Sequence, residues 1–195
     1  MSMKKNTRET ILDTAGRLFF TQGYHATGLN QIIKESEAPK GSLYYYFQGG
    51  KEELALECIQ RIGKEVADTF WSKLSGEEPV SEVMPRMIRE LADEMQREDF
   101  ANFMPFSFWA AAETSCVSHP LREACTDVFR SWQLVLADKL ELDGVERQEA
   151  QSLSLLLVTM MEGTLIVATT TKDVMPLLTA AQYIPQLIKQ HTRLS

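Results

Sequence analysis

Residues 27–51 read TGLNQIIKESEAPKGSLYYYFQGGK, and this stretch decides the fold that the sequence predicts. Its apolar residues recur three and four positions apart, which indicates two short helices, over 27–36 and 39–47. Thr27 is placed to cap the first helix, and Pro39 lies in the first turn of the second, where its missing N–H costs nothing. Two short helices joined by a tight turn are typical of a helix-turn-helix unit, whose second helix enters the DNA major groove.

The second of these helices carries side chains that suit DNA. Lysine donates to guanine or phosphate, glycine permits close backbone approach, and serine and tyrosine hydroxyl groups reach bases or phosphate oxygens. The positive end of a helix attracts phosphate, and Thr27 and Lys51 stand at two such ends. The expected DNA-binding residues are Thr27, Lys40, Gly41, Ser42, Tyr44, Tyr45, Tyr46 and Lys51. The alternative is that the tyrosines only pack within a small helical subdomain.

The charge of the chain is divided unevenly. Residues 1–51 contain seven basic and four acidic residues, a local charge of +3, although the whole chain carries −7. The remaining 144 residues therefore carry −10. Phosphate attraction is local, and distant acidic charge is screened beyond about 8 Å at physiological salt. The division favours an N-terminal part that attracts anions, the head, followed by an acidic remainder of the chain, the body.

The rest of the chain is also expected to be helical, because its apolar residues keep the same spacing. Gly23 is expected to end a first helix over 7–21, and SGEEPVS at 75–81 is the clearest linker. Further helices are expected over 51–74, 81–98, 101–115, 119–141, 146–171 and 174–191. We therefore predict an all-α protein of about nine helices, in which a three-helix head precedes a larger helical body.

Residues 11–56, ILDTAGRLFFTQGYHATGLNQIIKESEAPKGSLYYYFQGGKEELAL, resemble the signature of the TetR family of transcriptional regulators. The resemblance covers a first helix that ends in phenylalanine and glycine, a threonine opening the second helix, and the ending G-S-L-Y-Y-x-F followed by K-E-E-L. It implies a helix-turn-helix DNA-binding domain over 1–50, a connecting helix over 51–74 and a ligand-binding and dimerisation domain over 75–195.

Two positions depart from the pattern of that family. Tyr46 stands where the family often has histidine, which alters a phosphate contact. The loop Gln48-Gly49-Gly50 is one residue longer than usual, which changes the reach of Lys51. The extended form F-x-G-G-K-E is similar to the branch that contains flavonoid-responsive repressors of the LmrA/QdoR kind.

The body contains an aromatic group that suits a flat apolar ligand, since aromatic and methionine side chains offer stacking faces and adaptable packing. Pro105 is expected to kink the helix that holds most of it. Expected ligand-binding residues are Phe103, Phe106, Trp109, Glu113, Phe129, Trp132 and Met161. The alternatives are that the aromatic residues form plain core and that Glu113 faces solvent.

The last two helices are apolar on more than one side, which favours burial against a second copy of the chain. Expected dimerisation residues are Leu156, Met160, Ile166, Tyr183 and Leu187. The alternative is a fully internal core helix. Together with the family resemblance, the predicted dimer face and aromatic ligand site indicate a homodimeric repressor. A small hydrophobic or aromatic effector is expected to release it from a palindromic double-stranded DNA operator. A helical protein-binding adaptor with a vestigial head is the rival interpretation.

Other classes of function find little support. The three histidines are scattered, and no zinc-protease, nucleophile-elbow or phosphate-loop motif occurs, so we expect no enzyme activity, metal or cofactor. The three cysteines are expected to be reduced core thiols, with redox sensing by Cys116 and Cys125 as the alternative. No apolar run approaches a membrane span and the chain begins with polar and basic residues, so we expect a cytoplasmic protein.

Overall fold

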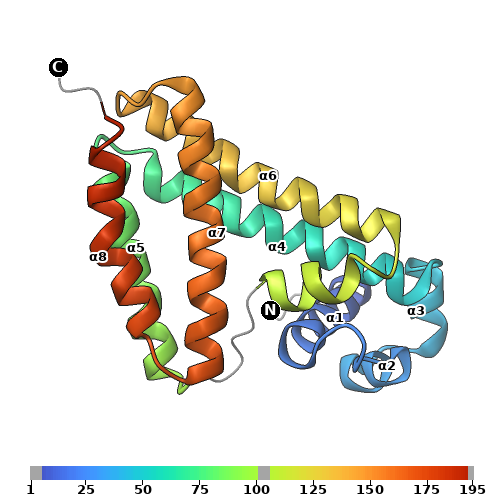
Figure 1. Ribbon diagram of the computed structural model, residues 1–195. Helices are drawn as coiled ribbons and strands as arrows, with labels where there is room; N and C mark the ends of the chain where they lie inside the picture. The colour runs from blue at the N-terminus through green and yellow to red at the C-terminus, as the bar shows by residue number, and fades with distance from the viewer. Residues whose placement is uncertain (1–5, 101–105, 193–195) are drawn as a thin grey trace, which may run out of the picture. The chain divides into compact units, whose positions relative to one another are not determined.

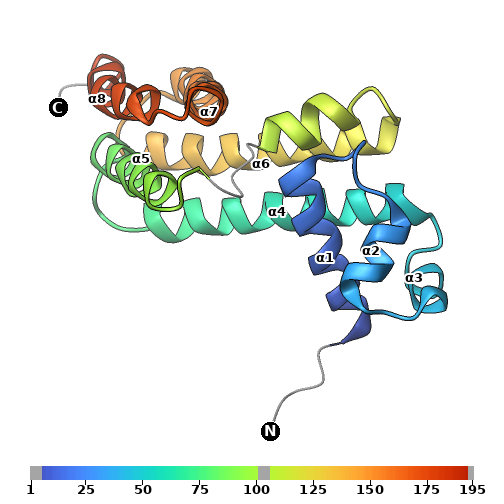
Figure 2. The same ribbon diagram turned by 90° about the horizontal axis from the view of Figure 1, so that it is seen from below.

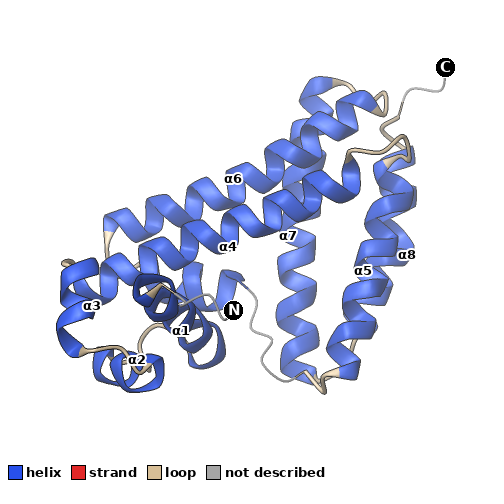
Figure 3. Ribbon diagram, turned by 180° about the vertical axis from the view of Figure 1, so that it is seen from behind, coloured by secondary structure: helices blue, strands red, loops and turns tan. Residues whose placement is uncertain are grey.

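The computed structural model describes residues 6–100 and 106–192, apart from the side chain of Phe108. These residues form eight α-helices and one short π-helix joined by loops, and they contain no strand (Figure 3). The predicted all-α class is confirmed. Contacts divide the chain into two compact units: Met1–Ile62 with Phe106–Thr126, and Gly63–Pro105 with Asp127–Ser195.

The first unit is built around three short helices, α1 (Thr7–Gln22), α2 (Leu29–Ser36) and α3 (Lys40–Tyr46), which lie together in Figure 2. The Asn6 side chain caps α1 by accepting a hydrogen bond from the backbone N–H of Arg8, at 3.2 Å. Their apolar faces meet in a shared core, to which the start of α4 (Gly50–Leu74) contributes. Its fully buried members include Ile11, Ala15, Phe19, Ile32, Leu43, Phe47, Leu54 and Ile59.

The first helix of the predicted DNA-binding motif begins later than its sequence indicates. The N-cap of α2 is Gly28, in place of the expected Thr27. The Thr27 hydroxyl instead donates to the Gly23 carbonyl oxygen at 2.7 Å, within the turn after α1. The expectation that Thr27 caps this helix was therefore wrong, because its side chain completes the preceding turn.

The second unit contains α5 (Val80–Arg97), α7 (Arg147–Thr171) and α8 (Met175–Lys189), and Figure 1 shows α8 beside both α5 and α7. It also holds the later parts of α4 and of α6 (His119–Leu142). Within it the Trp132 indole N–H donates to the Gly63 carbonyl oxygen at 3.0 Å. That bond ties α6 to α4, because it pairs a buried donor with a helix carbonyl group.

Most predicted helices agree with the structure to within two residues at each end. The exception is the helix expected over 101–115. Residues 101–105, which include the predicted kink at Pro105 and the candidate ligand residue Phe103, lie outside the described residues. The π-helix η1 (Ser107–Ala112) follows. π-helices are rare in proteins, and those that occur often lie at functional sites.

Helix α7 is long and apolar enough to cross a membrane by length and composition alone, but it is a core helix and not a membrane span. One stripe of α7 is buried within the second unit, through residues such as Leu153, Leu157 and Leu165. Other apolar residues of α7, Leu155, Leu156 and Val167, are exposed.

Candidate nucleic-acid interface

Helix α3 is anchored in the core of the head by apolar side chains, and most of its other side chains are exposed. Leu43 in the helix and Phe47 directly after it are both fully buried in the head core. Lys40, Gly41, Tyr44 and Tyr45 are exposed, and Tyr45 is exposed by 74%. Ser42 and Tyr46 are half-buried. The structure therefore brings six of the eight predicted DNA-binding residues onto one short helix, and four of the six are exposed.

Gly41 is not required by the packing of the head. A Cβ atom built at this position would meet nothing within 4 Å, and Gly41 does not have a positive φ. Alanine would fit there and would favour the helix by about 1 kcal/mol. Neither space nor backbone conformation within the head explains the glycine, whereas close approach of a partner to α3 would.

The other two predicted residues lie differently. Thr27 is only 1% exposed, and its hydroxyl accepts a hydrogen bond from the Gln22 amide besides donating to Gly23. Lys51 is half-buried, with its ammonium nitrogen 4.3 Å from the centre of the Tyr24 ring. Burial lowers the pKa of Lys51, and the charge of Glu113 opposes that shift. Phosphate contacts by these two residues stay predictions.

The last residue of the loop Gln48-Gly49-Gly50 begins α4. Gly50 has a φ of +64°, in the left-handed region that favours glycine, and α4 begins at this residue. The Glu53 carboxylate accepts from the backbone N–H of Gly49 at 2.7 Å, which satisfies one of the free donors before the helix. The additional residue in the loop is therefore held by α4 itself.

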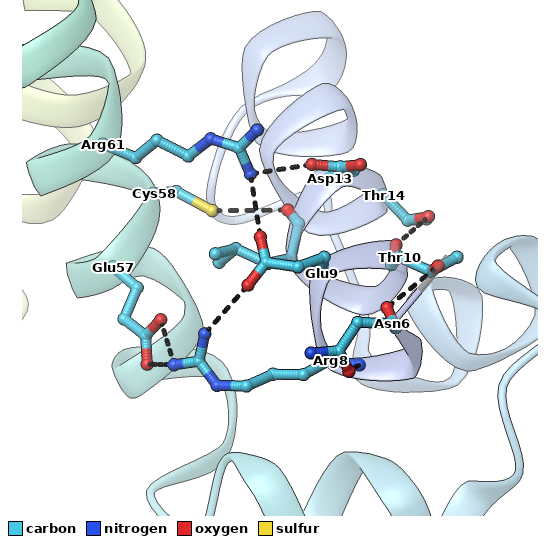
Figure 4. A network of polar contacts seen from close by, with 10 residues as sticks. Asn6, Arg8, Glu9, Thr10, Asp13, Thr14, Glu57, Cys58 and Arg61 are labelled. Atoms are coloured by element: carbon cyan, nitrogen blue, oxygen red, sulfur yellow. Dashed lines mark hydrogen bonds and ion pairs between the residues drawn. The ribbon is translucent and has the colours of Figure 1, made fainter. Parts of the chain in front are cut away.

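Ion pairs join α1 to the first part of α4 (Figure 4). The Arg8 guanidinium contacts both Glu57 carboxylate oxygens at 2.6 Å, and the Arg61 guanidinium lies 2.7 Å from the Asp13 carboxylate. Between them, the Cys58 thiol faces the Leu12 carbonyl oxygen. Burial raises the pKa of the Cys58 thiol to about 12, so this cysteine is protonated at neutral pH and acts as a core residue.

The predicted ligand residues fall in both units. In the first, Phe106 and Trp109 are buried, with Trp109 stacked 5.9 Å from Phe19 between ring centres. The indole nitrogen of Trp109 is buried and has no hydrogen-bond partner among the described residues. Glu113 accepts hydrogen bonds from the backbone of the turn after α1.

In the second unit, Trp132 is buried, and Phe129 meets it edge to face with 5.6 Å between ring centres. Met161 is half-buried. The predicted dimerisation residues also belong to this unit, on α7 and α8. None of the five is buried: Leu156 and Tyr183 are exposed, and Met160, Ile166 and Leu187 are half-exposed.

Three short helices that share a buried core and leave α3 exposed are typical of a helix-turn-helix DNA-binding protein. Comparison with known families extends this assignment to the whole chain. Residues 11–58 match the family described as bacterial regulatory proteins, tetR family, and residues 80–183 match the C-terminal domain of LmrA/YxaF-like transcriptional regulators. The chain belongs to the TetR family of transcriptional regulators, and the predicted resemblance to its LmrA branch is confirmed.

Two relatives from Bacillus subtilis strain 168 support this assignment over nearly their full length. The regulator YxaF is 42% identical over 97% of this chain and 99% of its own. The regulator LmrA is 39% identical over 95% of this chain and 98% of its own. These relatives are transcriptional regulators, and the chain is accordingly not an enzyme.

Solved structures show the same fold. Reduced NemR from E. coli has a TM-score of 0.79 at 23% identity, over 91% of this chain and 94% of its own. A TetR regulator from Chloroflexus aurantiacus has a TM-score of 0.80 at 24% identity, over 97% of both chains.

Proposed function

We propose that this chain is a cytoplasmic repressor that binds a palindromic operator as a homodimer and leaves it when a small hydrophobic or aromatic effector binds. The observation that carries the proposal is the exposed face of α3. Lys40, Tyr44 and Tyr45 are exposed there while Leu43 anchors the helix from below. A helix held in this way presents its polar side chains to the major groove while its apolar side chains remain buried in the core of the head.

The contacts of α3 divide by chemistry. The Lys40 ammonium suits guanine acceptors or phosphate, and the tyrosine hydroxyl groups suit phosphate oxygens. At Gly41 the open space above the backbone suits a close approach to the groove. The local charge of +3 over residues 1–51 adds attraction that does not depend on base sequence.

Dimerisation is supported by the exposed apolar side chains of α7 and α8. Leu155, Leu156, Val167 and Tyr183 are each exposed by 44 to 55% in the single chain. Apolar residues at this spacing on neighbouring helices are expected to be covered, and two identical faces make an isologous four-helix contact. A dimer would set two α3 helices on successive major grooves, about 34 to 36 Å apart.

The effector is expected to be flat and largely apolar, because the aromatic side chains of the body offer stacking faces. Trp109, which belongs to the first unit, offers a polar anchor, since its buried indole N–H has no partner among the described residues. An unpaired buried donor costs about 1–3 kcal/mol, which an acceptor on the effector would recover. The indole of Trp132, by contrast, is already paired with Gly63.

Release would follow if the effector binds more tightly to a conformation in which the two heads are spaced differently. Helix α4 is the candidate lever, because it is one continuous helix whose residues belong to both compact units. The effector acts only through its difference in affinity between the two states.

The test is operator binding by the double variant Lys40→Ala, Tyr44→Ala, measured by fluorescence anisotropy on DNA flanking the protein's own gene. We expect the dissociation constant to rise at least about tenfold, because each lost contact is worth about 1–3 kcal/mol. Lys64→Ala, which removes one exposed lysine of the body, is the control and should bind like the wild type. A flavonol added to the wild-type complex should weaken binding.

Wild-type affinity in the double variant would refute the α3 interface. Absence of salt-dependent DNA binding in the wild type would instead favour the adaptor interpretation.

A further inference from the structure

The turn between α1 and α2 is held by a residue that lies far away in the sequence. The Glu113 carboxylate accepts hydrogen bonds from two consecutive backbone N–H groups, those of Tyr24 and His25, the second at 3.2 Å. Gly23, which precedes them, has a φ of +87°. Consecutive N–H groups beside such a residue form a small concave site that favours an anion.

The turn is shaped to this carboxylate. A Cβ atom added to Gly23 would lie 2.7 Å from a Glu113 oxygen, so the glycine leaves the space that Glu113 fills. The negative end of the α1 dipole is unfavourable for an acidic group, and the two N–H groups offset it. The ammonium group of Lys51, which lies over the Tyr24 ring, adds an attractive charge.

Glu113 comes from a segment that is itself anchored to α1. It directly follows η1, in which Trp109 is fully buried and stacks on Phe19 of α1. The next residue, Thr114, is also fully buried and donates its hydroxyl to the Ala110 carbonyl oxygen. Residues 106–114 thus contact the end of α1 through a stacked ring, and the turn after it through a carboxylate.

We infer that Glu113 is a positioning residue for DNA recognition, which holds the α1–α2 turn so that α2 and α3 are ordered before the operator arrives. It contacts no DNA itself. Without it the turn must be ordered during binding, and that loss of freedom weakens the complex. The inference goes beyond the proposed repressor role, because it requires only the DNA-binding head and not the effector.

The direction in which operator affinity changes when Glu113 is replaced separates a positioning role from an effect of net charge alone. Removing a carboxylate from a DNA-binding unit makes it more positive, which by itself strengthens DNA binding. Loss of Glu113 is inferred to do the opposite. Glu123→Gln removes the same charge from an exposed side chain of the same unit, and is therefore the matched control.

The test uses the full-length protein and an operator that the wild type selects from a pool of random DNA. We expect Glu113→Ala to raise the dissociation constant about tenfold, the usual effect of losing hydrogen bonds to a charged group. Glu113→Gln, whose neutral oxygen still accepts, should raise it about threefold. Glu123→Gln should bind as tightly as the wild type or more tightly.

Hydrogen exchange of the Tyr24 and His25 amides, followed by NMR without DNA, gives a readout at the contact itself. Both amides should exchange about tenfold faster in Glu113→Ala than in the wild type. If Glu113→Ala fails to fold, Glu113→Gln decides the question by the same two measurements.

Operator affinity equal to or above that of Glu123→Gln, or unchanged exchange at both amides, overturns the inference. Either result leaves wild-type operator binding intact, so it is distinct from failure of the proposed function.

Discussion

Gly63 shows at the scale of one residue how closely α4 and α6 pack. A Cβ atom built on it would lie 2.3 Å from a methyl carbon of Val128, whose branched side chain has little rotational freedom. We expect Gly63→Ala to lower the free energy of unfolding by about 1–3 kcal/mol, the usual effect of overpacking, although alanine favours helices. Urea denaturation measures the change.

Gly16→Ala is the control for that substitution. Its added methyl group would lie at an ordinary 3.6 Å from the Cys58 sulfur, so helix propensity should dominate. We expect its stability to be unchanged or raised by up to about 1 kcal/mol. Equal stability of Gly63→Ala and wild type would show that Val128 moves aside.

Residue roles were predictable where they depend on local pattern. Leu43 and Phe47 recur at helical spacing, which predicts a buried side of α3, whereas the exposure of Lys40 and Tyr44 was decided by the structure. Thr27 was misassigned as a helix cap, because a threonine before an apolar helix has the same local pattern whether it caps that helix or completes the preceding turn. No local sequence pattern predicts the contacts of Glu113 with the backbone, since its partners are 88 and 89 residues away.

At the scale of elements, α1 is joined to α4 by the Arg8–Glu57 ion pair. The two side chains are 34% and 25% exposed, so solvent screens only part of their attraction. A double-mutant cycle with Arg8→Ala and Glu57→Ala should give a coupling energy of about 0.2–1 kcal/mol. The measurement is urea denaturation, repeated at high salt, where we expect the coupling to fall.

The exposed pair Lys64–Asp68, within α4, provides the comparison. Its side chains are 77% and 64% exposed, and such i,i+4 pairs contribute about 0.3–0.5 kcal/mol. Zero coupling for Arg8–Glu57, or coupling that salt does not weaken, would show that charge attraction in this pair does not help to join α1 to α4.

Helix positions were predictable because helical hydrogen bonds and apolar spacing are both local. The π-helix η1 was not, because its wider turn is compatible with the same residues as an α-helix. Trp109, in its middle, stacks on Phe19 of α1, a contact between segments 90 positions apart that no local pattern contains.

At the scale of the whole molecule, the exposed faces of α7 and α8 predict the assembly. In a dimer, lysines in place of Leu156 and Tyr183 would bury like charges without a partner of opposite sign, which is strongly unfavourable. We expect the double variant Leu156→Lys, Tyr183→Lys to sediment at half the wild-type mass. Its affinity for a palindromic operator should fall by about a hundredfold or more, because two linked sites become one.

Leu142→Lys is the control for this variant, since Leu142 on α6 is exposed by 82% and should remain so. We expect it to sediment and bind DNA like the wild type. A double variant that keeps the wild-type mass would place the dimer contact on another face.

The sequence by itself determined the all-helical class, the family and the buried side of α3, because each depends on residues close together along the chain. Only the tertiary structure decided that residues 106–126 join the compact unit of the head, and that Glu113 holds the turn after α1. The physical reason is that such contacts form between segments which the folded core brings together. Their partners depend on how whole helices pack, and a periodic pattern specifies only which side of each helix is buried.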